Sequence, residues 1–227
     1  MGLLQRQNGY TNIKICGLSK PQDMMTANTL TIEAVGLVFF PPSPRYVTPQ
    51  QALQLTSILN DQIEVVALVV DPSDELVAEI RSQVRVDIWQ FHGNESAKRC
   101  AEIAQSTPWM KAARIDHQFS LQDFCLEYNE CAAWILDAVV EGYGGGGQTF
   151  NWQLIPEIWI KENAHRVVLS GGLNSHNVAE AIAYFQPLGV DISSGVEITR
   201  GNKDPNLMQQ FVDAVRLTDQ FNSFKGS

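Results

Sequence analysis

The sequence lacks any hydrophobic run near the ~20 residues needed to cross a bilayer. It also lacks a secretion signal, because MGLLQRQNGYTN has neither a long apolar segment nor a small-residue cleavage site. The chain has 227 residues, of which 44% are hydrophobic, and can bury a sizeable core. We therefore expect a cytoplasmic protein without membrane contacts, with residues 1–11 as a short N-terminal extension.

Basic charge is scarce. The chain has 16 Lys and Arg residues against 25 Asp and Glu residues, a net charge of −9. Binding to nucleic acid requires a basic surface, so nucleic acid is not an expected partner. An anionic small molecule is still allowed, because backbone amides and a single arginine can bind phosphate or carboxylate whatever the global charge.

Cysteine motifs are missing as well. The four cysteines, Cys16, Cys100, Cys125 and Cys131, form no C-x-x-C pair and have no accompanying His-x3–5-His pair. A structural zinc site is therefore not expected. Without a secretion signal, a disulfide framework is not expected either, and a reducing compartment fits best.

What the chain does contain is an alternation of short apolar runs and amphipathic stretches. The predicted strands are 12–16, 34–39, 64–70, 86–91, 109–113, 132–137, 166–170 and 189–193. The predicted helices are 21–30, 49–60, 72–83, 95–105, 120–130, 175–186 and 204–221, with a short helix near 152–160. Eight such units predict an α/β fold, a single (β/α)8 TIM barrel of eight parallel strands over residues 12–227. The alternative is an open doubly wound sheet, but CGLSKP replaces its G-x-G-x-x-G fingerprint after the first strand.

Polar and glycine residues concentrate where the strands end, which in a barrel is the mouth that carries chemistry. The last two strands end in LSGGLNS and DISSGVE. Small residues allow backbone N–H groups to approach an anion, and a helix N-terminus beyond them adds oriented donors. We expect a phosphate site formed by Gly171, Gly172, Ser193, Ser194 and Gly195. The alternative for each stretch alone is a capped tight turn.

The first strand, NIKIC, places Lys14 and Cys16 on one face and Ile13 and Ile15 on the other. The isoleucines suit packing against outer helices, so Lys14 and Cys16 should point into the barrel. A nearby ammonium favours the thiolate, which is the basic form of cysteine. A buried lysine needs a partner, and Asp191 on the adjoining last strand is the candidate. The alternative for Cys16 is a small apolar core residue.

Three further side chains are candidates at the mouth. Asp137 ends the apolar run AAWILD, where an acid needs solvation, a partner or a function. Its alternative role is a loop cap. Arg45 lies in the proline-stiffened PPSPRYV, which can aim a guanidinium at a carboxylate, although a surface arginine is the alternative. His92 is either a structural histidine or a substrate contact.

Together, KICGL, GLVFFPPSPRYV, QFHGNE, LDA, GYGGGGQTFNW, LSGGL and VDISSGVE with GNKD resemble the phosphoribosylanthranilate isomerase family. The motifs occur in the family's order over residues 12–204. The resemblance implies an enzyme of tryptophan biosynthesis that needs no cofactor and no metal. It implies an Amadori rearrangement of N-(5-phosphoribosyl)anthranilate to 1-(2-carboxyphenylamino)-1-deoxyribulose 5-phosphate.

The resemblance also implies roles for individual residues. Asp137 is the general acid that protonates the furanose ring oxygen, and Cys16 is the general base that removes the proton from C2. Arg45 binds the anthranilate carboxylate, and Asp191 orients a sugar hydroxyl or Cys16. The glycines and serines of the last two strand ends bind the phosphate, and His92 is a candidate substrate contact. We expect a monomer rather than a dimer.

The sequence departs from the family's G-G-T-G-K-x-F-D-W segment at Gly146, Gln148 and Asn151. A more flexible loop is expected there, while the acid, the base and the anion-binding residues are intact. Two other functions remain open. One is a different phosphosugar barrel, such as an epimerase, an aldolase or an indole-glycerol-phosphate synthase. The other is a barrel that binds its ligand without catalysis.

Overall fold

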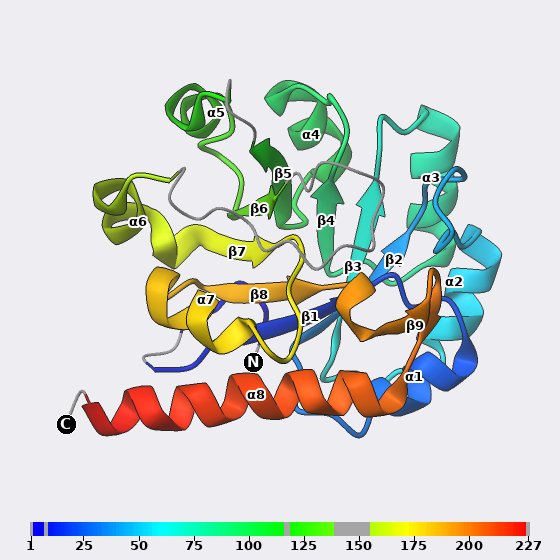
Figure 1. Cartoon of the computed structure of the whole chain (residues 1–227). Helices are drawn as coiled ribbons and strands as arrows, with labels where there is room; N and C mark the ends of the chain where they lie inside the picture. Colours follow the sequence, from blue (N-terminus) through cyan, green and yellow to red (C-terminus); the bar gives the residue numbers. More distant parts are fainter. Residues whose placement is uncertain (1, 7–8, 116–118, 139–154, 226–227) are drawn as a thin grey trace.

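The computed structural model describes residues 2–6, 9–115, 119–138 and 155–225. Within these ranges, eight parallel strands close into a barrel in chain order, β1 to β8. Helices alternate with the strands and form an outer layer around them (Figure 1). The predicted (β/α)8 barrel is confirmed, and the closed ring of strands excludes the open sheet.

The observed elements follow the predicted alternation closely. The strands are β1 (Asn12–Cys16), β2 (Ala34–Val38), β3 (Glu64–Val69), β4 (Ile88–Phe91), β5 (Trp109–Ile115), β6 (Ala133–Ala138), β7 (Val167–Ser170) and β8 (Gly189–Ile192). The helices are α1 (Pro21–Ala27), α2 (Pro49–Thr56), α3 (Asp74–Gln83), α4 (Ala97–Ala104), α5 (Leu121–Glu127), α6 (Glu157–Asn163), α7 (Val178–Phe185) and α8 (Pro205–Lys225). Each strand boundary lies within about two residues of its prediction.

Several helices begin where their sequences provide a cap. Thr48, Ser73, Ser96 and Ser120 precede α2 to α5, and each side chain accepts a hydrogen bond from the backbone N–H three residues later. The helices α1 and α2 end earlier than predicted, at Ala27 and Thr56. The apolar residues after them, such as Leu30 and Leu59, are buried in the connections to the next strands.

A small hairpin after β8 was not predicted. The 3-10 turn η3 (Ser194–Val196) leads into β9 (Glu197–Thr199), which pairs antiparallel with β10 (Asn202–Lys203). A second 3-10 turn, η2 (Ala164–Arg166), precedes β7. Strands of three and two residues are too short to show a period in sequence.

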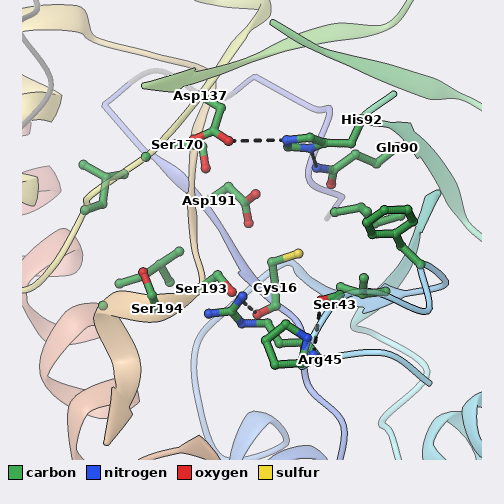
Figure 2. A pocket seen from close by; sticks show the side chains of 18 of the residues that line it. Cys16, Ser43, Arg45, Gln90, His92, Asp137, Ser170, Asp191, Ser193 and Ser194 are labelled. Atoms are coloured by element: carbon green, nitrogen blue, oxygen red, sulfur yellow. Dashed lines mark hydrogen bonds and ion pairs between the residues drawn. The ribbon is translucent and has the colours of Figure 1, made fainter. Parts of the chain in front are cut away.

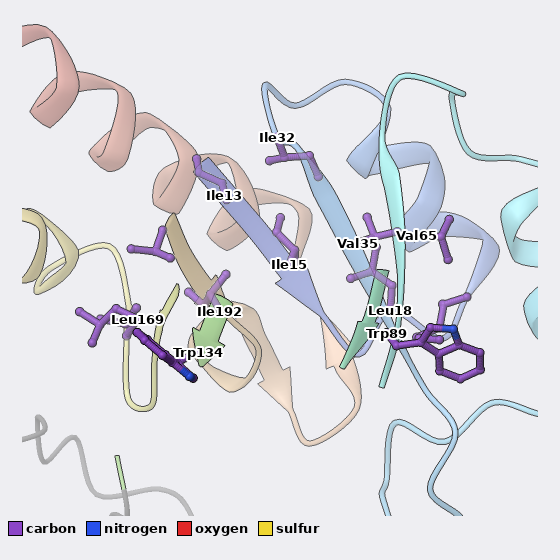
Figure 3. Packing of buried hydrophobic residues seen from close by; sticks show 14 of the residues in the cluster. Ile13, Ile15, Leu18, Ile32, Val35, Val65, Trp89, Trp134, Leu169 and Ile192 are labelled. Carbon is purple, nitrogen blue, oxygen red and sulfur yellow. The ribbon is translucent and has the colours of Figure 1, made fainter. Parts of the chain in front are cut away.

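The two faces of β1 separate as predicted. Ile13 and Ile15 pack in the apolar layer between barrel and helices, as Figure 3 shows. Lys14 is fully buried and Cys16 lies beside Val38 and Leu68 inside the mouth. A separate apolar cluster fills the opposite end of the interior: Leu3, Ala34, Val66, Ile88, Met110, Ala112, Ala133, Ile135, Val168 and Leu188.

The N-terminal segment contributes to this interior. Leu3 is fully buried in the apolar cluster just described, and its backbone N–H donates to Glu64 Oε2 over 2.7 Å. Asn12 Nδ2 donates to the Leu3 carbonyl over 2.8 Å. Residues 2–6 thus close the end of the barrel opposite the mouth. No helix in the described ranges is long and apolar enough to span a membrane.

Candidate active site

A cavity of about 530 Å³ opens where the strands end. Every side chain or glycine predicted for the site lines it: Cys16, Arg45, His92, Asp137, Gly171, Gly172, Asp191, Ser193, Ser194 and Gly195. Figure 2 shows Asp137 and His92 on one side, Cys16 and Arg45 on the other, and Asp191 between them. The structure therefore brings together residues that the sequence spreads over six strand ends.

A buried ion pair lies below Cys16. Lys14 Nζ is 2.8 Å from Asp191 Oδ1, and the two residues face each other in the register of β1 and β8. The predicted pair is confirmed. Its side chains are 0% and 6% exposed, so each charge depends on the other for compensation.

Two glycines make room for this arrangement. A Cβ at Gly36 on β2 would lie 2.7 Å from Cys16 Sγ and 3.1 Å from Lys14 Cε. A Cβ at Gly17 would lie 2.3 Å from Arg45 Cδ, and Gly17 has a positive φ of 77°. Only glycine fits both requirements at position 17, since other residues rarely adopt that conformation. The base candidate and the arginine stem therefore lie against bare backbone.

Burial controls the protonation of Cys16. Burial is the largest effect and raises the pKa of the Cys16 thiol above its ordinary value, while the Lys14 ammonium opposes it and the Asp191 carboxylate adds to it. The expectation that Lys14 favours the thiolate is correct in sign, but desolvation outweighs it. We therefore expect Cys16 to rest as a thiol at neutral pH.

Asp137 lies within a polar chain that begins deeper in the barrel. His92 Nε2 is 3.3 Å from Asp137 Oδ2, and His92 Nδ1 is 3.3 Å from Gln90 Nε2. With the Gln90 amide nitrogen donating to Nδ1, the ring proton lies on Nε2 and faces Asp137. Gln90 is fully buried, so its position is fixed by packing. His92 therefore contacts the acid candidate directly.

The loops after β7 and β8 form one wall of the cavity, where the phosphate site is expected. Gly171 and Gly172 have positive φ values of 85° and 66°. Within the described ranges, the backbone N–H groups of Gly171, Gly172, Ser194 and Gly195 donate to no protein acceptor. A Cβ at Gly195 would lie 2.0 Å from the Leu173 carbonyl oxygen, so the two loops approach closely only with glycine there. The helix donors predicted beyond these turns are more distant, since α7 begins only at Val178 and β8 is followed by η3.

Arg45 is not a free surface arginine. Its Nε and Nη2 donate to Glu197 Oε1 and Oε2, each over 2.7 Å, and its side chain is 19% exposed. Glu197 and Lys203, which supports it, were not singled out from the sequence. Both lie in the quoted motifs VDISSGVE and GNKD, which could have drawn attention to these residues but not to their contact with Arg45. Gln90 was also passed over, although it is a polar residue on an inward strand position.

A comparison with protein families gives a match over residues 13–214 to the model described as N-(5'phosphoribosyl)anthranilate (PRA) isomerase. The chain belongs to this family. A relative from Ralstonia nicotianae named N-(5'-phosphoribosyl)anthranilate isomerase is 44% identical over 92% of this chain and 94% of its own. One of the same name from Dechloromonas aromatica is 41% identical, with 92% and 98% covered. The family expected from the sequence motifs is confirmed.

Solved structures agree with this assignment. The phosphoribosyl anthranilate isomerase of Thermotoga maritima is 33% identical, with a TM-score of 0.82 over 91% of this chain and 98% of its own. Another structure of such an isomerase contains reduced 1-(o-carboxyphenylamino)-1-deoxyribulose 5-phosphate. It is 29% identical, with a TM-score of 0.78 and the same shares covered.

The remaining expectations concern metal binding, the departures from the family motif, the oligomeric state and nucleic acid. In the described ranges, no group of three or more His, Cys, Asp or Glu side chains could hold a metal ion. The departures at Gly146, Gln148 and Asn151 lie outside the described residues. The monomeric state and the absence of nucleic acid stay predictions.

Proposed function

We propose that this protein catalyses the Amadori rearrangement of N-(5-phosphoribosyl)anthranilate to 1-(2-carboxyphenylamino)-1-deoxyribulose 5-phosphate, a step of tryptophan biosynthesis in the cytoplasm. Cys16 and Asp137 carry the proton transfers. The observation that supports this best is their placement on opposite sides of one cavity (Figure 2). An acid and a base on opposite sides of a sugar are what this isomerisation requires.

The reaction divides into two proton transfers followed by a tautomerisation. Asp137 gives a proton to the ring oxygen as the C1–O bond breaks, and the anilino nitrogen supplies the electrons that form an iminium ion. The Cys16 thiolate then removes the proton from C2, and its electrons form the C1–C2 double bond of an enolamine. The enolamine gains a proton at C1 and loses the C2 hydroxyl proton to give the ketone.

The surroundings of each group suit its role. The His92 N–H faces Asp137 and stabilises the carboxylate left after proton donation. The Lys14 ammonium stabilises the thiolate of Cys16 when it forms. Because burial raises the pKa of Cys16, the thiolate is a minority form at neutral pH, and turnover proceeds from that minority. A base of high pKa takes the C2 proton with a larger driving force.

The two ends of the substrate would be held by opposite parts of the mouth. The unpartnered amides of the β7 and β8 loops suit the phosphate, and Arg45 suits the anthranilate carboxylate. Remote contacts of this kind place the reacting carbons between acid and base. Asp191, held by Lys14, lies between Cys16 and Asp137 and suits a sugar hydroxyl.

The test is turnover of freshly made N-(5-phosphoribosyl)anthranilate, followed by the loss of its fluorescence. We expect activity in the wild type and losses on the order of 10²–10⁴-fold in kcat for Cys16→Ala and for Asp137→Asn. Glu180→Gln on the outer helix α7 is the control and should match the wild type. Full activity in either site variant would refute that residue's role, and an inactive wild type would indicate a barrel that binds without catalysis.

A further inference from the structure

The hairpin β9–β10 after η3 contains a charged group that the catalytic scheme does not use. Glu197 opens β9 and Lys203 ends β10. Their side chains are 3% and 0% exposed, although both lie in a hairpin at the mouth. Burying two charges in such a short element costs free energy unless they perform a task there.

Glu197 holds Arg45 by one edge. Both carboxylate oxygens accept from the guanidinium, at Nε and at Nη2, each over 2.7 Å. This two-point contact fixes the plane of the guanidinium as well as its position. In the described part of the chain, Nη1 has no protein partner, so the end-on edge of the guanidinium stays available in the cavity that Arg45 lines.

Lys203 holds Glu197 in turn. Its Nζ donates to Glu197 Oε1 over 2.7 Å and to the Ser193 carbonyl over 2.9 Å. Burial raises the pKa of Glu197, but the hydrogen bonds from Arg45 and Lys203 outweigh it and hold that pKa below the ordinary value. The group of Arg45, Glu197 and Lys203 therefore carries one net positive charge, beside a pocket that we expect to take two anionic groups.

The backbone of the hairpin is fitted to the loop that carries Arg45. A Cβ at Gly201 would lie 2.7 Å from the Pro44 carbonyl oxygen, and Gly201 has a positive φ of 79°. The Gly201 N–H donates to Glu197 Oε2 over 3.2 Å. On the other side, Lys20 beyond β1 donates to Asn202. The hairpin is thus packed against two mouth loops at once.

We propose that Glu197, held by Lys203, is a positioning residue that aims Arg45 and makes the site select substrates bearing a carboxylate on the aromatic ring. This inference rests on the proposed function, because it concerns the same substrate. Glu197 acts only through Arg45 and touches no reacting atom. It determines how much the ring carboxylate contributes to binding.

The experiment compares two stable ligands by titration calorimetry. One is reduced 1-(o-carboxyphenylamino)-1-deoxyribulose 5-phosphate, and the other is the same compound without the carboxylate. In the wild type we expect removal of the carboxylate to weaken binding roughly 30–100-fold, the worth of a charge-assisted two-point contact. In Glu197→Gln this ratio should fall below about 5-fold, since the guanidinium is no longer fixed. With substrate, KM should rise about 10-fold while kcat stays within about 3-fold.

Controls separate positioning from a general loss of structure. Glu33→Gln removes a buried carboxylate paired with Arg216 at the other end of the barrel, and its carboxylate ratio should equal that of the wild type. If Glu197→Gln folds poorly, the pair Glu197→Gln with Lys203→Met removes both buried charges and should show the same reduced ratio. A ratio in the Glu197 variants equal to that of the wild type would overturn the inference, while turnover by the wild type would still uphold the proposed function.

Discussion

Cys16 lies where burial and charge act in opposite directions on one sulfur atom. The side chain is 5% exposed, which favours the neutral thiol, and the Lys14 ammonium beside it favours the thiolate. Burial prevails, so the pKa of the thiol is above its ordinary value. Lys14 is itself paired with Asp191, whose negative charge offsets part of the stabilisation that the ammonium gives the thiolate.

The protonation state of Cys16 gives a direct prediction. Thiolates absorb near 240 nm and thiols do not, so the difference in absorbance between the wild type and Cys16→Ala reports this one sulfur. At pH 7 we expect no thiolate signal in the difference. The signal should rise only above pH 9, because a raised pKa keeps the proton on sulfur until then. A full signal at pH 7 would contradict the thiol resting state.

The other cysteines allow the same measurement to be calibrated. Burial raises the pKa of Cys100 to about 12, and the pKa of Cys125 and Cys131 to about 11 each. Cys125→Ala removes a thiol that does not line the cavity at the mouth. Its difference spectrum should therefore show a titration near pH 11 that is unaffected by ligand. The Cys16 difference should change when a phosphosugar ligand fills the pocket, because that changes the burial of the sulfur.

At the scale of the element, β2 has a glycine, Gly36, at the position where a side chain would crowd Cys16. Gly36 is paired with Cys16 in the register of β1 and β2. In Gly36→Ala the new Cβ would meet Cys16 Sγ at 2.7 Å, so the sulfur must move. We expect kcat/KM to fall about 100-fold, the cost of a small misplacement of a reacting group. The stability cost should be about 1–3 kcal/mol, as for other overpacked cores.

Gly189→Ala on β8 is the matched control for Gly36→Ala on β2. Its Cβ would lie 2.8 Å from the Asn12 carbonyl oxygen, at the end of the barrel opposite the mouth. The overpacking is similar, but no site residue is touched. Activity measured per folded protein should stay near that of the wild type while the melting temperature falls. Equal losses of activity in the two variants would mean that Gly36 acts through stability alone.

The strands of the barrel could be predicted from the sequence, whereas the hairpin β9–β10 could not. Strands β1 to β8 could be predicted, because apolar runs such as EVVALVV have a length and composition that packing imposes. The inward position of Lys14 followed from alternation within a single strand. The task of Glu197 could not be predicted, since its partner Arg45 is 152 residues away and the contact exists only after the barrel closes.

At the scale of the whole molecule, the two ends of the barrel have different compositions. The mouth holds buried charges and bare glycine backbone, arrangements that serve chemistry and cost stability. The opposite end is filled by apolar side chains from six of the strands, together with Leu3 and Leu188. Stability is therefore expected to come mainly from the closed end, where changes can be made without touching the mouth.

Leu3→Ala tests this division. Leu3 is fully buried among side chains of the barrel interior, so its truncation should leave a cavity and lower the free energy of unfolding by about 2–5 kcal/mol. Turnover of the folded variant should be unchanged, because Leu3 does not line the cavity at the mouth. Leu53→Ala on α2, where the side chain is 47% exposed, is the control and should change stability by no more than about 0.5 kcal/mol. Denaturant unfolding of both variants measures the two changes in the free energy of unfolding. If Leu3→Ala costs no more than Leu53→Ala, residues 2–6 do not contribute to the stability of the barrel and belong to the short extension expected over residues 1–11. A cost of several kcal/mol makes residues 2–6 part of the barrel.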